Sequence, residues 1–153
     1  MEMDHVVDID ATPEAVWQVL TDFEHYEQWN PLAVRCKTSL VPGEPIDMWV
    51  RLTSGPLRHQ REWMRTHTPG QEFSYSMKPV PLGALRSLRT QSLTPLEGGR
   101  TRYAAHFEVR GWLEPVVRLM LGSSLRRGFD GVAAGLKARA EGADAAAGPA
   151  GEG

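Results

Sequence analysis

The segment between residues 5 and 31 constrains the fold of this chain more than any other part. Residues 5–10 alternate polar and apolar side chains with a period of two, which predicts a half-buried strand. Thr12 is a suitable N-cap for a helix whose first position is Pro13. Asp22 restarts the helical pattern, and Pro31 bars its continuation. The chain is therefore expected to begin with one strand and two short helices.

The rest of the chain predicts antiparallel strands and one long helix. Turn residues separate strand-like segments at 32–40, 46–52, 57–67, 73–77, 85–94 and 101–110. Their short connections favour an antiparallel meander over parallel βαβ units. Residues 113–141 instead carry an apolar stripe at helical spacing, formed by Leu121, Leu125, Phe129, Val132, Leu136 and Ala140. The predicted fold class is α+β, with a curved sheet of about seven strands wrapped around the C-terminal helix, and this shape tends to enclose a cavity.

Four glycines interrupt the predicted long helix, at positions 122, 128, 131 and 135. Each costs roughly 1 kcal/mol relative to alanine in a helix interior. Their number predicts either a tight approach of the helix backbone to another group or a bend near Gly122.

Composition limits the classes of protein to which the chain can belong. A length of 153 residues predicts one domain, and a net charge of −2 argues against a dedicated nucleic-acid binder. A single cysteine excludes an internal disulfide, and no apolar run approaches the roughly 20 residues of a membrane span. No signal peptide is visible, so the expected location is the cytoplasm. Residues 1–141 are expected to form the domain, and the Ala- and Gly-rich residues 142–153 a disordered tail.

The strand at 57–67 is the most informative place to search for a site. One face carries Arg58, Gln60, Glu62, Met64 and Thr66, and the other includes Trp63. Pairing across the turn at 68–71 sets Glu62, Met64 and Thr66 beside Met77, Tyr75 and Phe73, which combines polar groups with an aromatic, thioether-rich wall. A buried Glu62 would have a raised pKa and could act as a general acid or base. The alternative is that this face is solvated and Trp63 points inward, because a slip of one residue reverses every assignment.

Candidate residues follow from these expected inner faces. The candidate catalytic residues are Glu62, Tyr75, Tyr103 and His106. The candidate ligand-binding residues are Met48, Val50, Gln60, Met64, Phe73, Met77, Leu88, Ala105, Phe107, Met120, Ser124 and Gly128. The small residues of the helix would leave room for a ligand or simply allow close packing on the sheet. No histidine pair has the spacing of a zinc motif, and the lone Cys36 has no partner cysteine, so neither a metal site nor a cofactor is expected.

Several segments resemble the START/birch-pollen-allergen superfamily, also called SRPBCC, and within it the bacterial polyketide cyclase/dehydrase-type branch. The resemblance is carried by the runs 9–17, 21–22 and 29–31, Tyr26, the hairpin 93–102, Phe107, Gly111 and the pair 136–137. It covers residues 4–141 and implies the helix-grip fold. It implies less about function, because these positions look like packing and turn residues. The family includes aromatase/cyclases, lipid and quinone carriers, hormone receptors and co-chaperones.

Three functions remain open at this point. The first is the binding of a hydrophobic or aromatic small molecule, such as a lipid, quinone or polyketide, in a cavity between sheet and helix. The second is a polyketide aromatase/cyclase or dehydratase activity in the same cavity. The third is a lipid or quinone carrier that docks on a membrane through the loop 79–88, which is flanked by Lys78, Arg86 and Arg89. An ordinary loop at the rim of the cavity explains this segment equally well. No patch indicates a protein partner, either a monomer or a homodimer is expected, and no hydrolase or phosphate-loop motif is present.

Overall fold

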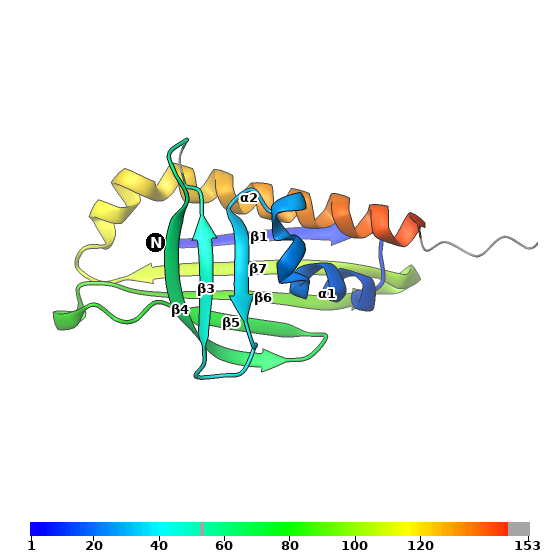
Figure 1. The fold of residues 1–153 in the computed structure, drawn as a ribbon, viewed down its shortest axis with the longest axis horizontal. Helices are drawn as coiled ribbons and strands as arrows, with labels where there is room; N and C mark the ends of the chain where they lie inside the picture. Colours follow the sequence, from blue (N-terminus) through cyan, green and yellow to red (C-terminus); the bar gives the residue numbers. More distant parts are fainter. Residues whose placement is uncertain (53, 147–153) are drawn as a thin grey trace, which may run out of the picture.

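The computed structural model describes residues 1–52 and 54–146 as one antiparallel sheet with helices on its inner side. Seven strands pair in the order β1-β7-β6-β5-β4-β3-β2. They are β1 (Glu2–Ile9), β2 (Ala33–Thr38), β3 (Pro45–Val50), β4 (Arg58–Thr68), β5 (Glu72–Ser76), β6 (Arg86–Leu96) and β7 (Arg100–Arg110). Figure 1 shows the long helix α2 (Glu114–Ala146) running beside β1 and along the curved sheet. The predicted helix-grip fold is confirmed.

The first helix of the N-terminal pair has the cap that its sequence predicts, whereas the second lacks the expected cap from Asp22. Helix α1 (Pro13–Thr21) begins where Thr12 Oγ1 accepts a hydrogen bond of 3.2 Å from the Ala15 amide. The next turn, η1 (Phe23–Gln28), is a 3₁₀-helix and receives no side-chain cap from Asp22. That carboxylate instead lies 2.8 Å from His25 Nδ1. Two further 3₁₀-turns, η2 (Pro81–Gly83) and η3 (Glu97–Gly99), occupy connections between strands.

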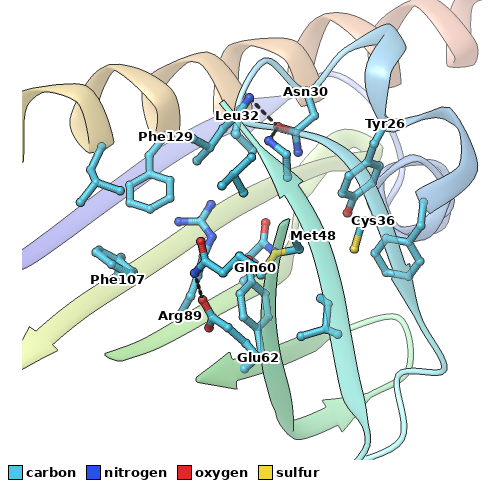
Figure 2. A pocket seen from close by; sticks show the side chains of 18 of the residues that line it. Tyr26, Asn30, Leu32, Cys36, Met48, Gln60, Glu62, Arg89, Phe107 and Phe129 are labelled. Atoms are coloured by element: carbon cyan, nitrogen blue, oxygen red, sulfur yellow. Dashed lines mark hydrogen bonds between the residues drawn. The ribbon is translucent and has the colours of Figure 1, made fainter. Parts of the chain in front are cut away.

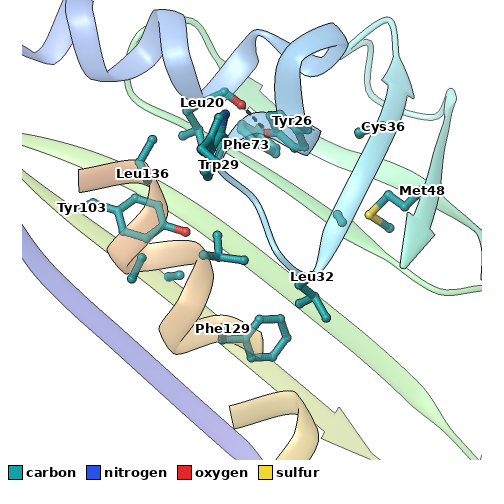
Figure 3. Close-up of a cluster of buried hydrophobic side chains, with 14 of the residues drawn as sticks. Leu20, Tyr26, Trp29, Leu32, Cys36, Met48, Phe73, Tyr103, Phe129 and Leu136 are labelled. Carbon is teal, nitrogen blue, oxygen red and sulfur yellow. Dashed lines mark hydrogen bonds between the residues drawn. The ribbon is translucent and has the colours of Figure 1, made fainter. Parts of the chain in front are cut away.

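The solid part of the core lies at the end of the sheet next to α1. The side chains with no exposed surface are Ile9, Val16, Leu20, Thr101, Tyr103, Leu136 and Ala140. They come from the end of β1, from α1, from the start of β7 and from the C-terminal half of α2. Figure 3 shows this cluster, with Tyr103 beside Leu136 and Leu20 beside Trp29. The middle of α2 and the strands β2–β5 therefore remain to form the walls of a site.

The glycines of α2 make room for the segment that links η1 to β2. A Cβ atom on Gly135 would lie 2.0 Å from the carbonyl oxygen of Trp29, and one on Gly131 would lie 2.7 Å from Pro31 Cγ. A Cβ atom on Gly128 would lie 2.9 Å from a methyl carbon of Leu32. The predicted tight approach of the helix backbone is thus confirmed at three of the four glycines, against a backbone carbonyl at Gly135 and against side chains at Gly131 and Gly128. Helix α2 also continues to Ala146, so residues 142–146 are helical rather than part of a tail; residues 147–153 lie outside the described residues.

A β-bulge in β4 changes the predicted pairing with β5. Met64 lies opposite Tyr75 as expected, but Thr66 lies opposite Ser74 rather than Phe73. The register shift between Met64 and Thr66 reverses the alternation of side chains beyond it. Thr66 therefore turns outward, where its hydroxyl donates to Glu72 over 2.7 Å.

Candidate functional site

A cavity of about 90 Å³ lies between the inner face of the sheet and the middle of α2. Its wall is mostly apolar and is formed by Phe23, Tyr26, Asn30, Leu32, Ala33, Cys36, Ile46, Met48, Val50, Leu52, Gln60, Glu62, Phe73, Tyr75, Arg89, Gln91, Phe107, Leu125, Phe129 and Val132. An apolar cavity of roughly 150 Å³ is needed to accommodate benzene. The cavity is therefore small, and a ligand of more than one ring can enter only if wall side chains move.

A hollow on the surface adjoins the cavity. It has a volume of about 370 Å³ and lies between the loop after β3 and the first half of α2. Val50 and Leu52 belong to both the hollow and the cavity wall, so these two side chains separate the two spaces. Movement of Val50 and Leu52 would join the hollow to the cavity.

Strand β3 places the apolar wall through simple alternation. Ile46, Met48 and Val50 are buried on the inner face of the strand, as their spacing predicts. Opposite them, Phe129 of α2 packs against Phe107 of β7 with ring centroids 4.9 Å apart. The two aromatic rings and the aliphatic side chains of β3 give the cavity an apolar lining on facing sides.

Glu62 is a buried carboxyl group in this apolar wall. It is 5% exposed, and the side-chain amide of Gln60, which lies exposed at the edge of the cavity, donates a hydrogen bond to it. Burial raises the pKa of Glu62 to about 7, although the Gln60 hydrogen bond and the positive charge of Arg89 act in the opposite direction. Glu62 can therefore gain or lose a proton near neutral pH.

Arg89 is the second charged group of the cavity and is 6% exposed. Its guanidinium carbon lies 4.0 Å from the centroid of the Phe129 ring, in a cation–π contact. Nη1 is buried without a hydrogen-bond partner, and within the described chain no carboxylate lies within 4.0 Å of this side chain. Removing an ion from water costs several kcal/mol unless partners compensate for it. Figure 2 shows Arg89, Gln60 and Glu62 converging on the space below Phe129.

The tyrosines of the site can act only as neutral groups near physiological pH. Burial raises the pKa of Tyr75 and of Tyr103, and it raises that of Tyr26 well above its ordinary value. The Tyr103 hydroxyl donates to Gln91 Oε1 over 2.7 Å, and the Tyr26 hydroxyl donates to the carbonyl of Leu20. These hydroxyls hold the wall in place, and none is a ready base.

The structure brings together many of the residues selected from the sequence. The cavity wall contains Met48, Val50, Gln60, Glu62, Phe73, Tyr75 and Phe107. Met64, Tyr103 and Ala105 are buried in the adjoining core without lining the cavity. The face of β4 that carries Gln60, Glu62 and Met64 therefore points inward as far as Met64. Trp63, on the opposite face, lies beside a separate surface hollow. The roles assigned to these residues stay predictions.

Other selected residues lie outside the cavity, and their placement there corrects the prediction. Residues of β7 alternate, so Tyr103, Ala105 and Phe107 point inward and His106 points outward, with Nδ1 2.7 Å from Asp4 Oδ1. Five more residues do not contribute to the wall, namely Met77, Leu88, Met120, Ser124 and Gly128. Leu88 precedes the inward-facing Arg89 and so faces outward, and Met77 follows the end of β5.

The three residues selected on α2 do not line the cavity, and one reason accounts for all of them. The face of α2 that meets the sheet is the apolar stripe through Leu125, Phe129 and Val132. Met120, Ser124 and Gly128 lie on a neighbouring face, where Met120 is 72% exposed at the surface hollow and Gly128 contacts Leu32.

Sequence reasoning missed several residues of the wall, above all Arg89. One of the hypotheses left open placed it beside a membrane-docking loop, whereas its side chain lines the cavity. The signal was present in the alternation of β6, in which Arg89, Gln91 and Leu93 are buried and the residues between them are not. Asn30, which the sequence favours as a junction residue rather than a ligand contact, also lines the wall. Its Oδ1 accepts hydrogen bonds from the amides of Leu32 and Ala33 at 3.0 and 2.9 Å.

Two other kinds of feature are absent from the described residues, a metal-binding cluster and a membrane-spanning helix. No group of three His, Cys, Asp or Glu side chains there is arranged to hold a metal ion. In the same part of the chain, no helix has the length and apolar character required to cross a membrane. The thiol of Cys36 lines the cavity, but burial raises its pKa to about 12, so it is a poor nucleophile.

Comparisons with known proteins agree with this architecture. The model of the family described as "Polyketide cyclase / dehydrase and lipid transport" matches residues 1–141. A search of curated proteins finds no match. Among solved structures, the Zhui aromatase/cyclase of a Streptomyces species has 18% identity and a TM-score of 0.77, covering 97% of this chain and 98% of that chain. A START superfamily protein from Mycobacterium smegmatis has 18% identity and a TM-score of 0.68, and the match covers 93% of this chain and 98% of that chain. A protein from Nitrosomonas europaea has 16% identity and a TM-score of 0.74, and the match covers 95% of this chain and 97% of that chain.

Proposed function

Because this chain belongs to the polyketide cyclase/dehydrase and lipid transport family, we propose that it binds a hydrophobic or aromatic small molecule between the sheet and α2. The observation that carries the proposal is the apolar cavity with a few convergent polar side chains, which is the usual character of a small-molecule site. The small cavity volume and the facing aromatic rings favour a flat ring system over a long acyl chain.

The first test is native mass spectrometry of the purified protein, with solvent extraction of any molecule that co-purifies. The second is a calorimetric titration with 2-naphthol. Val50→Phe should weaken binding at least tenfold, because the larger ring fills the boundary between the surface hollow and the cavity. Val6→Phe is the matched control, since Val6 is 62% exposed on β1 and away from the cavity. The proposal fails if no ligand co-purifies and 2-naphthol does not bind, or if both variants bind equally well.

The second candidate function is cyclisation or dehydration of a polyketide-like substrate held in the same cavity. Glu62 favours it, because a carboxyl group with a pKa of about 7 is suited to proton transfer at neutral pH. As a carboxylate, Glu62 would remove a proton from the carbon between two ketone groups. The resulting enolate carbon would attack a third carbonyl of the same chain, and the proton on Glu62 would pass to the alkoxide formed there. Glu62, again a carboxylate, would then remove the second proton from the attacking carbon as the new hydroxyl leaves, and the departing hydroxide would take that proton from Glu62 to form water. Similarity to an aromatase/cyclase structure supports this reaction class.

The enzymatic proposal is tested with a linear poly-β-ketone thioester as substrate and mass-spectrometric detection of the dehydrated product. Glu62→Gln should reduce the rate at least a hundredfold, because general acid–base catalysis commonly contributes factors of roughly 10²–10⁴. The same variant should still bind 2-naphthol, since glutamine preserves the size of the side chain. An unchanged rate would remove Glu62 from the mechanism while leaving the binding function intact.

A further inference from the structure

We propose that Arg89 is an anion-binding group and that the ligand of the cavity is a planar apolar molecule bearing an anionic oxygen, as a carboxylate, phenolate or enolate. The inference rests on the proposed function, because it assigns the class of ligand that the cavity takes. It comes from the side-chain environment of Arg89, which differs from that of other arginines in this sheet.

Three exposed arginines on strands next to or near Arg89 have carboxylate partners. Arg61, Arg100 and Arg102 each bind an aspartate, with N–O distances of 2.8, 2.6 and 2.8 Å. Arginine is always charged in proteins, so an arginine on the inner face needs an acceptor more than these do. Within the described residues, Arg89 has no ion pair, and Nη1 is buried without a hydrogen-bond partner.

The Arg89 side chain is directed into the cavity by the strand that carries it. On β6, Arg89 pairs with Tyr75 of β5 on one side and with Phe107 of β7 on the other. All three residues line the cavity. The guanidinium carbon lies over the Phe129 ring, 4.0 Å from its centroid. An acceptor that reaches the guanidinium from inside the cavity would leave the rest of its molecule beside the aromatic rings of the wall.

Glu62 does not fill the role of this acceptor. Its carboxyl group accepts the Gln60 amide and lies beyond 4.0 Å from Arg89. The two groups are thus separate elements of the cavity wall. The chemistry that fits is an anionic oxygen in the plane of a ring or conjugated chain, because arginine binds such oxygens with charge-assisted hydrogen bonds.

The test is a pair of probes of the same shape, cinnamate and cinnamamide, titrated calorimetrically into the full chain. Wild-type protein should bind cinnamate about 10- to 150-fold more tightly than cinnamamide, the range expected for one hydrogen bond to a charged group in a protein interior. Arg89→Met should abolish this preference and leave the affinity for cinnamamide unchanged. Arg86→Met is the matched control, because it removes an exposed positive charge from the same strand and should preserve the preference.

The outcomes separate this inference from the proposed function. If both probes bind with equal affinity, or if Arg89→Met retains the preference for cinnamate, the anion site is refuted while the binding function stands. If neither probe binds and no molecule co-purifies, both fail. Thermal unfolding of Arg89→Met is measured in parallel to check that this variant folds. If it does not fold, Arg89→Lys replaces it as the test. This variant keeps the positive charge, so it must retain part of the preference for cinnamate over cinnamamide.

Discussion

Replacing Glu62 with glutamine should stabilise the protein at pH 8 and leave its stability nearly unchanged at pH 4.5. Burial raises the pKa of Glu62 to about 7 in the folded state, from an ordinary value of 4.5. Below pH 4.5 the carboxyl group is protonated in both the folded and the unfolded chain, and it contributes no pH dependence. Between pH 4.5 and 7 the unfolded chain loses the proton first, so the free energy of unfolding falls as the pH rises.

Above pH 7 the carboxyl group is ionised in both states, and the destabilisation reaches its full value. The two pKa values differ by about 2.5, which corresponds to about 3 kcal/mol. For a domain of this length, about 3 kcal/mol corresponds to a difference of about 6–12 °C in Tm. Glutamine carries no charge at any of these pH values and can still accept the hydrogen bond of Gln60, so the variant avoids this penalty.

Thermal unfolding of the wild type and of Glu62→Gln at pH 5, 6, 7 and 8 measures the effect. Other titrating groups, such as Glu114 and Glu141 with their lowered pKa values, are common to both proteins and cancel in the difference. Glu27→Gln is the control, since this glutamate is exposed on η1. A Tm difference that is constant from pH 5 to pH 8 would show that Glu62 is ionised throughout this range, and the argument for a neutral-pH acid or base would be refuted.

Three further predictions concern the wall and its supports. Asn30→Ala should lower the free energy of unfolding by about 2–5 kcal/mol in chemical denaturation, because it leaves two buried amides without their acceptor. Gly135→Ala should cost about 3 kcal/mol or more, since its Cβ would meet the carbonyl of Trp29, whereas Gly142→Ala, with nothing within 4 Å, should be neutral or slightly stabilising. Cys36 should react with a thiol reagent at pH 8 at a rate limited by opening of the cavity; reaction as fast as that of a free thiol would contradict its burial and its pKa of about 12.

The order of the elements was predictable because it depends on local signals. The cap at Thr12, the turns and the alternation of β3 each act over a few residues, and each appears where it was expected. The face of β4 was harder, because its bulge after Met64 reverses the alternation and no turn or proline marks the position. A bulge is set by how two strands pair, and this information is not contained in either strand alone.

The candidate site was only partly predictable, for a reason that Arg89 illustrates. Arginine is rarely buried, so a sequence pattern that places it next to a proline-rich loop favours a surface position. Its inward orientation follows from the phase of β6, which is fixed by pairing with β7 along the whole strand. Likewise, α2 has two neighbouring faces that carry small or apolar residues. The segment 29–32 crosses α2 at the glycines of one face, and this crossing decides that the other face meets the cavity.

The two charged groups of the cavity give binding and catalysis different requirements. An anionic ligand at Arg89 adds a second negative charge near Glu62, and this favours the protonated form of that carboxyl group. The other ionisable groups around them stay neutral near pH 7, because burial raises the pKa of Tyr75 and Tyr103 and lowers that of His5. A carrier needs only Arg89 to hold the ligand oxygen, whereas a cyclase also needs Glu62 to exchange a proton with it. Loss of turnover in Glu62→Gln with retained selection of anions therefore distinguishes an enzyme from a carrier built on the same cavity.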